Sequence, residues 1–259
     1  MLQLAIDTAL EAGTFLKKNV GKIRQIEYKG GEKTNLVTEI DKKSEEIIFA
    51  RIREKHPDHD FLGEESGAAD VQSEYRWIID PLDGTINYTH GLPIYCVSIG
   101  LEYKGEIIVG VVYDPSMDEL FYAEKGKGAW MNKSRLRVSN TNELMSSLLV
   151  TGFPYSINKQ PEPTLTHFRN FIIHSQAVRR LGSAAIDLAY VACGRFDGFW
   201  EGTLNAWDMA AGILLVSEAG GVCTDYLGKP LNIYNQRVLA TNGVIHQPML
   251  DVLKSGMEG

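Results

Sequence analysis

Asp80 and Asp83 are separated by two residues in a stretch, residues 77–88, that reads as a strand followed by a turn. The apolar residues before Asp80 predict a buried strand, and we expect both aspartates to lie where this strand gives way to a loop. Gly84 and Thr85 then predict the start of a helix, whose free backbone N–H groups suit an anion. Carboxylates beside such a helix start predict a divalent metal ion between them. The stretch alone leaves open an ordinary Asp-Pro turn with a helix N-cap.

Two further aspartates lie at the starts of predicted helices. Asp41 opens the helix predicted over residues 41–55, and Asp208 falls in the first turn of the helix predicted over residues 206–219. An acidic side chain near a helix N-terminus is common, because it interacts favourably with the helix dipole. Each aspartate therefore predicts either a functional group or a residue that only stabilises its helix.

Three more acids follow short apolar stretches. Glu64 and Glu65 are adjacent, so at most one of them can point directly toward a given site if they lie in a strand. Glu201 follows an apolar strand and precedes a glycine, which fits either a solvated strand end or a ligand for a polar group. The small residues 182–185 at the start of another predicted helix allow either close approach of a ligand to the backbone or tight helix packing.

Composition and charge are those of a soluble globular protein. The 259 residues, 44% of them hydrophobic, suffice for one large domain or two closely joined lobes. No apolar run approaches the roughly 20 residues of a membrane span, and the amphipathic N-terminus is unlike a signal peptide, so we expect a cytoplasmic protein without membrane association. The net charge of −7 argues against broad nucleic-acid binding. Three widely spaced cysteines without a CxxC pair predict buried free thiols.

Elements predicted from residue periodicity divide the chain into two lobes. Residues 1–140 combine amphipathic helices with an antiparallel meander of strands over residues 95–123 and form an α+β lobe. Residues 141–259 alternate strands and helices and form an α/β lobe. No Pro-rich or Ser-rich linker separates the lobes, so we expect them to pack closely. A glycine-containing loop at residues 28–36 predicts either a lid or a plain connection.

Several motifs are spread over nearly the whole chain. They are Val37-Thr38-x-x-Asp41, Gly63-Glu64-Glu65-Ser66, Asp80-Pro81-Leu82-Asp83-Gly84-Thr85, Gly182-Ser183-Ala184-Ala185, and Trp207-Asp208 through Glu218-Ala219-Gly220-Gly221. In this order they resemble the inositol monophosphatase family, and the third of them is the most specific. The resemblance implies an α/β protein with a layered α-β-α-β-α sugar-phosphatase fold. It also implies an enzyme that hydrolyses phosphate monoesters with Mg²⁺.

The resemblance implies a site that binds two Mg²⁺ ions and, more weakly, a third. The residues that it implies as metal ligands are Glu64, Asp80, Leu82 through its backbone carbonyl, Asp83 and Asp208. Asp80 would be shared by the first two ions. All of these ligands are oxygen atoms, which Mg²⁺ prefers. Close carboxylates repel one another, so we expect the metal-free site to cost folding free energy and to be loosely ordered.

By the same resemblance, a water molecule attacks the phosphate. Thr85 and Asp41 are implied to orient and deprotonate this water, and Glu65 to support them. The N–H groups of Gly84 and Thr85 would hold the phosphate, and the loop at residues 28–36 would cover the metals. The residues implied to contact the substrate are Glu64, Leu82, Asp83, Gly84, Thr85, Gly182, Ser183, Ala184, Glu201 and Asp208.

Inositol monophosphate, a small phosphorylated polyol, is the substrate that the resemblance favours. Fructose 1,6-bisphosphate, NADP and nucleotide phosphates are alternatives within the same chemistry. An RNA-associated or transcription-complex role, with binding to RNA polymerase, is the alternative from another class, as in some bacterial relatives. The resemblance also implies a homodimer and sensitivity to lithium, and Lys33 and Asn35 vary the loop motif near the third ion.

Overall fold

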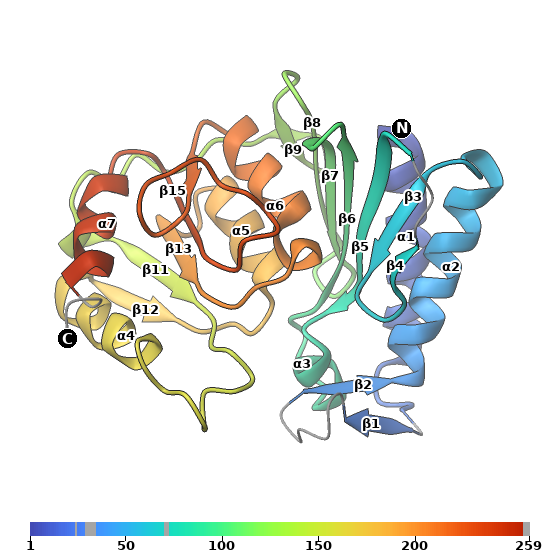
Figure 1. Ribbon diagram of the computed structural model, residues 1–259, viewed down its shortest axis with the longest axis horizontal. Coiled ribbons are helices and arrows are strands. Elements are labelled where there is room, and N and C mark those ends of the chain that lie inside the picture. Colours follow the sequence, from blue (N-terminus) through green and yellow to red (C-terminus); the bar gives the residue numbers. More distant parts are fainter. Residues whose placement is uncertain (24, 29–34, 70–72, 256–259) are drawn as a thin grey trace.

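Helices and sheets alternate in five layers in the part of the chain that the structure describes (Figure 1). This computed structural model describes all residues except 24, 29–34, 70–72 and 256–259. The two sheets lie on either side of a central helical layer. From one outer face to the other, the helical layers are α1 (Leu2–Asn19) with α2 (Glu39–Lys55), α5 (Ala184–Ala192) with α6 (Ala206–Glu218), and α4 (Thr164–His174) with α7 (His246–Ser255). The predicted layered fold is confirmed.

The larger sheet lies between the first two helical layers, and all its neighbouring strands are antiparallel except β3 and β5. In order across the sheet, its strands are β10 (Ser134–Arg135), β9 (Ala129–Met131), β8 (Glu119–Glu124), β7 (Glu106–Asp114), β6 (Cys96–Tyr103), β5 (Tyr75–Asp83), β3 (Asp60–Gly63) and β4 (Gly67–Ala69). The consecutive strands β6, β7 and β8 confirm the predicted meander. Lys104 and Gly105 both adopt positive φ between β6 and β7, as a two-residue hairpin turn requires.

The smaller sheet lies between the central helices and the outer pair, and it is mixed. In order, its strands are β12 (Ala177–Arg179), β11 (Leu148–Thr151), β13 (Gly198–Glu201), β15 (Val238–Thr241) and β14 (Val222–Thr224). Strand β11 is parallel to both neighbours, whereas β15 is antiparallel to both of its own. The other elements are the antiparallel pair β1 (Ile26–Tyr28) and β2 (Leu36–Thr38), the helix α3 (Thr85–Thr89) and the 3-10 helix η2 (Leu144–Ser146). The lobe boundary at residues 140 and 141 stays a prediction.

The prediction that both aspartates lie where the strand gives way to a loop is confirmed for Asp83, the last residue of β5, and was wrong for Asp80, which lies within the strand. Its pairing with β6 is irregular there, since Asp80 pairs with Ser98 and Asp83 pairs with Cys96. Three residues of β5 therefore span two of β6, which is a β-bulge. Pro81 has no N–H group to donate to a neighbouring strand, which explains the interruption. In a regular strand, residues three apart point to opposite faces; the bulge lets both aspartates face one side.

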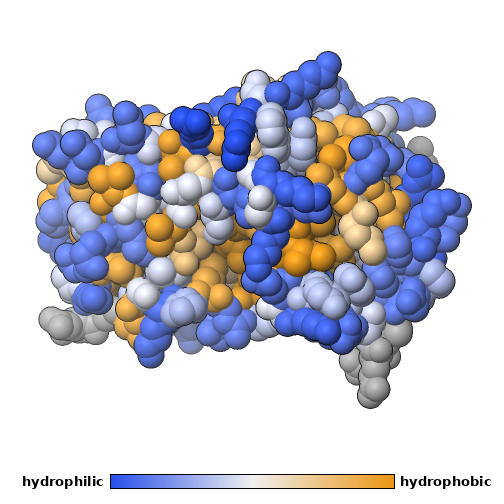
Figure 2. All heavy atoms as spheres, turned by 90° about the horizontal axis from the view of Figure 1, so that it is seen from above, coloured by the Kyte–Doolittle hydropathy of each residue, from blue (hydrophilic) through white to orange (hydrophobic). Residues whose placement is uncertain are grey.

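The apolar residues of β5 divide between buried clusters on opposite faces of the larger sheet. Trp77 and Ile79 pack with residues of α1 and α2, whereas Ile78 packs with Ala206 and Ala210 of α6. Both faces of this strand are therefore covered, which explains its continuous apolar run. Seen from above, the molecule carries hydrophilic side chains around its rim, and hydrophobic side chains show toward the middle (Figure 2).

Two further expectations concern a membrane-spanning helix and the burial of the cysteine thiols. Among the described residues, no helix combines the length and the apolar character that crossing a bilayer requires. The three cysteines are free, and Cys96 is buried, but Cys193 and Cys223 are only partly buried. The prediction of buried thiols was therefore wrong for these two. Cys193 caps the C-terminal end of α5 and Cys223 lies on the edge strand β14, positions at the margin of the core.

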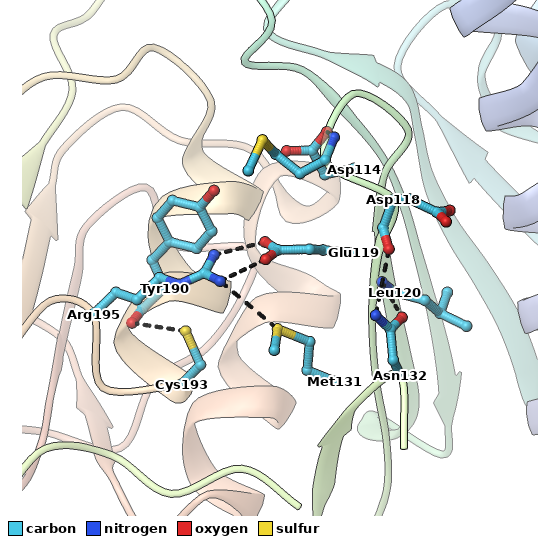
Figure 3. A network of polar contacts seen from close by, with 10 residues as sticks. Asp114, Asp118, Glu119, Leu120, Met131, Asn132, Tyr190, Cys193 and Arg195 are labelled. Atoms are coloured by element: carbon cyan, nitrogen blue, oxygen red, sulfur yellow. Dashed lines mark hydrogen bonds and ion pairs between the residues drawn. The ribbon is translucent and has the colours of Figure 1, made fainter. Parts of the chain in front are cut away.

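An ion pair joins the larger sheet to the turn after α5 (Figure 3). Two guanidinium nitrogens of Arg195 donate to the two carboxylate oxygens of Glu119 on β8, at 2.6 and 2.5 Å. The guanidinium carbon lies 4.5 Å from the centre of the Tyr190 ring. The Glu119 side chain is only 12% exposed, so the pair is partly shielded from water. This bidentate contact ties the central helical layer to the larger sheet.

We expect Glu119→Gln to lower the free energy of unfolding by about 1 kcal/mol, because a bidentate, partly desolvated pair is worth more than an exposed one. Urea denaturation followed by circular dichroism measures this change. Glu74→Gln is the matched control, since it removes an exposed pair with Lys104. It should change the unfolding free energy by less than about 0.5 kcal/mol. Equal effects would show that the Arg195 pair is no stronger than an exposed one.

Candidate active site

A cavity of about 400 Å³ is lined by segments from both halves of the chain. The end of β5 and the start of α3 bound one side of it, and segments around α5, β13 and α6 bound the other. The predicted metal ligands and substrate-contact residues all line it, namely Glu64, Asp80, Leu82, Asp83, Gly84, Thr85, Gly182, Ser183, Ala184, Glu201 and Asp208. Asn35 also lines it, but Asp41 and Glu65 do not. Lys33 and most of the predicted cover loop, residues 29–34, lie outside the described residues.

Four acidic side chains at this cavity are close enough to repel one another. Burial raises the pKa of Asp80 well above its usual value. Repulsion from Glu64, Asp83 and Asp208 raises this pKa further, as does a hydrogen bond to the Glu64 carboxyl group. Burial is also the main cause of the raised pKa of Asp208, followed by repulsion from Glu64. A divalent cation would stabilise negative charge that is buried and concentrated in this way.

Hydrogen bonds fix one carboxylate oxygen of each of two aspartates. Asp83 Oδ2 accepts hydrogen bonds from Ser183 Oγ and from the backbone N–H of Ala185, each at 2.7 Å. Burial raises the pKa of Asp83, and these hydrogen bonds oppose the rise. Asp208 Oδ2 accepts a hydrogen bond from the backbone N–H of Asn205 at 2.6 Å. This contact belongs to a capping box at the start of α6, so the helix itself positions Asp208.

The chemistry of these residues fits a hard divalent cation. Their donors are carboxylates and the Leu82 carbonyl, the oxygen ligands that Mg²⁺ takes. As the side chains stand, no group of three Asp, Glu, His or Cys residues in the described part of the chain is close enough together to hold an ion. A bound divalent cation would offset the mutual repulsion of these carboxylates.

Asp41 is buried and reaches the cavity through Thr85. The Thr85 hydroxyl lies 2.9 Å from Asp41 Oδ1 and 3.0 Å from the Leu82 carbonyl oxygen, and it can donate to either. Asp41 Oδ2 accepts hydrogen bonds from the backbone N–H and the hydroxyl of Thr38, at 2.9 and 2.5 Å. Burial raises the pKa of Asp41 to about 6, these hydrogen bonds oppose the rise, and repulsion from Glu65 adds to it. Asp41 is therefore a stronger base than an ordinary aspartate.

Gly84 and Thr85 form the start of α3, as predicted. Gly84 has a φ of 92°, a conformation that favours glycine. A Cβ atom at this position would lie only 2.8 Å from the carbonyl oxygen of Ile94. Any side chain here would thus push apart the backbone that lines the cavity.

Glu201 lies on the side of the cavity that the second half of the chain contributes. Burial raises its pKa to about 8, while Arg180 opposes the rise and Asp83 adds to it. A Cβ atom on Gly152 would overlap the Glu201 carboxylate, so this glycine leaves room for the side chain. Glu201 is therefore a buried acid enclosed at the cavity, rather than a solvated strand end.

We expect Glu201→Gln to gain stability relative to the wild type as the pH rises. The pKa of about 8 in the folded protein lies above the usual value of 4.5, so ionisation of Glu201 destabilises the fold. Its stabilising contribution is complete below about pH 4.5 and is lost as the pH rises through about 8. Urea titrations without metal should show a larger advantage of the variant at about pH 9 than at about pH 5. An equal difference at both pH values would contradict the raised pKa.

Sequence reasoning missed several residues that line the cavity. Arg180 is the one cationic side chain among its described lining residues. Asp187 is a further buried acid, whose Oδ1 has no hydrogen-bond partner and whose pKa is raised by burial and by repulsion from Glu201. In the sequence, both look like ordinary turn and helix residues, so no signal marked them. Asn205 could have been found, because its spacing to Asp208 is that of a capping box.

The sequence as a whole can be compared with known proteins. Residues 1–258 match the sequence pattern that describes the inositol monophosphatase family. The chain belongs to the inositol monophosphatase family. Inositol monophosphatase family members are metal-dependent phosphatases, so this chain is a phosphate monoester hydrolase and its substrate is a phosphorylated compound.

Relatives within the inositol monophosphatase family match nearly the full chain. An inositol-1-monophosphatase from Mesorhizobium japonicum is 43% identical over 255 residues, which cover 98% of this chain and 96% of that protein. The Nus factor SuhB of Pseudomonas aeruginosa is 40% identical, with coverage of 98% and 96%. The solved structure of an inositol monophosphatase from Anabaena (Nostoc) superposes with a TM-score of 0.89 at 45% identity, covering 98% of this chain and 95% of that one.

Proposed function

We propose that this protein is a Mg²⁺-dependent phosphatase that hydrolyses inositol monophosphate to inositol and phosphate. The observation that carries the proposal is a group of four acids at one cavity, one buried and three partly buried, to which both halves of the chain contribute. These acids are Glu64, Asp80, Asp83 and Asp208. A cavity of about 400 Å³ suits one small phosphorylated polyol. Family membership supports the same class of reaction.

The proposed metal ligands are the oxygen atoms at this cavity. The ligands are Glu64, Asp80 and the Leu82 carbonyl for the first ion, Asp80, Asp83 and Asp208 for the second, and Glu64 for a weaker third. When bound, the ions supply positive charge that stabilises the transferring phosphoryl group and lowers the pKa of the attacking water. The raised pKa values of Asp80 and Asp208 support this assignment, because burial and then repulsion from neighbouring acids raise them, and a bound cation would offset both effects. Sensitivity to lithium belongs to the same proposal.

Thr85 and Asp41 would take the proton of the attacking water. The Thr85 hydroxyl donates to Asp41 Oδ1, so the Thr85 oxygen can accept a proton from water as its own proton passes to the carboxylate. Glu65 adds to the basicity of Asp41 through its charge. The backbone N–H groups of Gly84 and Thr85 would bind phosphate oxygens at the start of α3.

The alcohol part of the substrate would meet the opposite side of the cavity. Glu201 and residues 182–184 offer a carboxylate, a hydroxyl and backbone groups there, and Asp83 of β5 reaches Ser183 by a hydrogen bond. These groups suit the hydroxyls of a polyol, because each hydroxyl can donate to a carboxylate. The proposal includes a homodimer and a cytoplasmic location, and the free cysteines support the latter.

A panel of phosphorylated substrates with Mg²⁺ tests the proposed specificity. Inositol monophosphate should give a higher kcat/KM than fructose 1,6-bisphosphate or NADP. The physical reason is that a cavity of about 400 Å³ suits one small phosphorylated polyol, and Glu201 offers a hydrogen-bonding group to its hydroxyls. Negligible turnover of inositol monophosphate beside strong turnover of NADP or fructose 1,6-bisphosphate would overturn this choice.

The identity of 40% to a Nus factor favours a second candidate function, binding to RNA polymerase in a transcription complex. Pull-down experiments with RNA polymerase should compare how much of the wild-type protein and of Asp83→Asn the polymerase retains. Capture of both forms would support a role that does not need catalysis. Capture of neither form would exclude it.

A further inference from the structure

The segment between β14 and β15 reaches across to the larger sheet through Tyr234. The Tyr234 hydroxyl donates a hydrogen bond to Glu102 Oε2 at 2.7 Å, and it accepts one from Arg76 at 3.3 Å. Arg76 on β5 and Glu102 on β6 are cross-strand partners. Tyr234 thus ties the second half of the chain to β5, the strand that carries Asp80 and Asp83.

The side chains that bind Tyr234 belong to a row of charges across three strands. Asp60 on β3 is the register partner of Arg76, and its Oδ2 accepts a hydrogen bond from Arg76 Nε at 2.7 Å. Asp60 is 1% exposed and Glu102 is 7% exposed. Arg76 therefore lies between two buried acids, a charge-assisted arrangement with little freedom to move. Tyr234 is anchored to a rigid part of the sheet.

The same segment is joined to the start of α6. The carbonyl oxygen of Gln236 accepts a hydrogen bond from the backbone N–H of Leu204 at 3.0 Å. Ile233 packs in one buried cluster with Ala206 of α6 and Ile78 of β5. The residues on both sides of Tyr234 thus hold the loop that leads into α6.

We propose that Tyr234 is a positioning residue that sets the place of Asp208 relative to Asp80 and Asp83. The residue after Leu204 is Asn205, whose backbone N–H holds the Asp208 carboxylate. A continuous path of contacts therefore runs from β5 through Tyr234 to Asp208. The inference rests on the proposed metal site, because the three aspartates would share the second ion.

Tyr234→Phe in the full-length chain removes only the hydroxyl of this tether. The Kd for Mg²⁺, measured by isothermal titration calorimetry, should rise on the order of 5-fold, the effect of losing about one hydrogen bond to a charged group. Amide hydrogen exchange in residues 204–210 should be faster with and without Mg²⁺. The kcat at saturating Mg²⁺ should stay close to the wild-type value, because the metal ligands themselves are intact.

Tyr122→Phe is the matched control. Its hydroxyl donates to the backbone carbonyl of Asn132 at 2.9 Å, and its ring packs against the buried cluster that includes residues of α1, on the other face of the sheet. It should change neither the Mg²⁺ affinity nor exchange at the start of α6. If the wild type binds Mg²⁺ and Tyr234→Phe binds it with the same Kd, the inference about Tyr234 is overturned and the proposed function is not. This holds even if the variant melts at a lower temperature. Failure of the wild type to bind Mg²⁺ would instead overturn the proposed function and the inference with it.

Discussion

Asp83→Asn is expected to lower kcat for phosphate release by about 1,000-fold or more, with the fold kept. Asp83 lines the cavity, is partly buried and lies near Asp80 and Asp208, so its charge would act directly on a shared cation. The amide can still accept the hydrogen bonds that Ser183 and Ala185 donate to Asp83. The fold should therefore survive while the charge is lost. Steady-state phosphate release with saturating Mg²⁺ measures the effect.

Two companion measurements separate this loss from a loss of structure. Without metal, Asp83→Asn should melt at the wild-type temperature or above it, because the substitution removes repulsion between neighbouring carboxylates. Asp251→Asn is the matched control, since Asp251 is exposed and contacts Gln247 on α7; it should leave kcat unchanged. Near-normal turnover in Asp83→Asn would refute the role of Asp83 as a metal ligand. Asp208→Asn should behave as Asp83→Asn does.

Thr85→Ala is expected to lower kcat by about 100-fold while leaving KM nearly unchanged. The hydroxyl of Thr85 is 2.9 Å from Asp41 Oδ1, so its loss breaks the path for the proton of the attacking water. Binding of the phosphate would use backbone N–H groups, which the substitution keeps. Initial-rate measurements over a range of substrate concentrations separate kcat from KM. Thr85→Ser keeps the hydroxyl and should retain most of the activity, whereas equal losses in Ala and Ser would argue against a proton path.

The pH dependence of kcat/KM tests the same pair. Burial raises the pKa of Asp41 to about 6 in the absence of metal, and the carboxylate must be ionised to accept a proton. Activity should therefore be full above this pKa and fall as the pH drops through about 6 or below, since nearby cations lower the pKa. Asp41→Asn should lower kcat/KM, and its residual activity should lack this acid limb. An unchanged acid limb in Asp41→Asn would assign it to another group.

The parts of the fold that could be predicted are those that local pattern determines. The helical spacing of apolar residues located α6, and the alternation in β6 and β7 located the meander. Trp77, Ile78 and Ile79 indicated a strand with both faces covered, because their run is continuously apolar. The end of that strand could not be predicted. Pro81 suggested a turn, and only pairing with β6 shows that it lies in a bulge instead.

Some residues of the site could be predicted from a sequence motif, and others could not. Asp80 and Asp83 stand in a specific motif, so their chemistry could be proposed before any geometry was known. Asp187 and Tyr234 carry no such signal, because their importance arises from neighbours that are distant in sequence. Tyr234 contacts Glu102, which lies 132 positions away in the chain. Contacts of this kind depend on how the layers pack, and residue spacing does not encode them.

Phosphate release from inositol monophosphate, with Mg²⁺ and with a chelator, tests the proposed metal-dependent hydrolysis most directly. Wild-type protein in a metal chelator should release no phosphate above background. Added Mg²⁺ should restore turnover along a saturable curve in the wild type and leave Asp83→Asn inactive. Turnover that is equal with the chelator and with Mg²⁺ would contradict the proposed role of the four acids at the cavity.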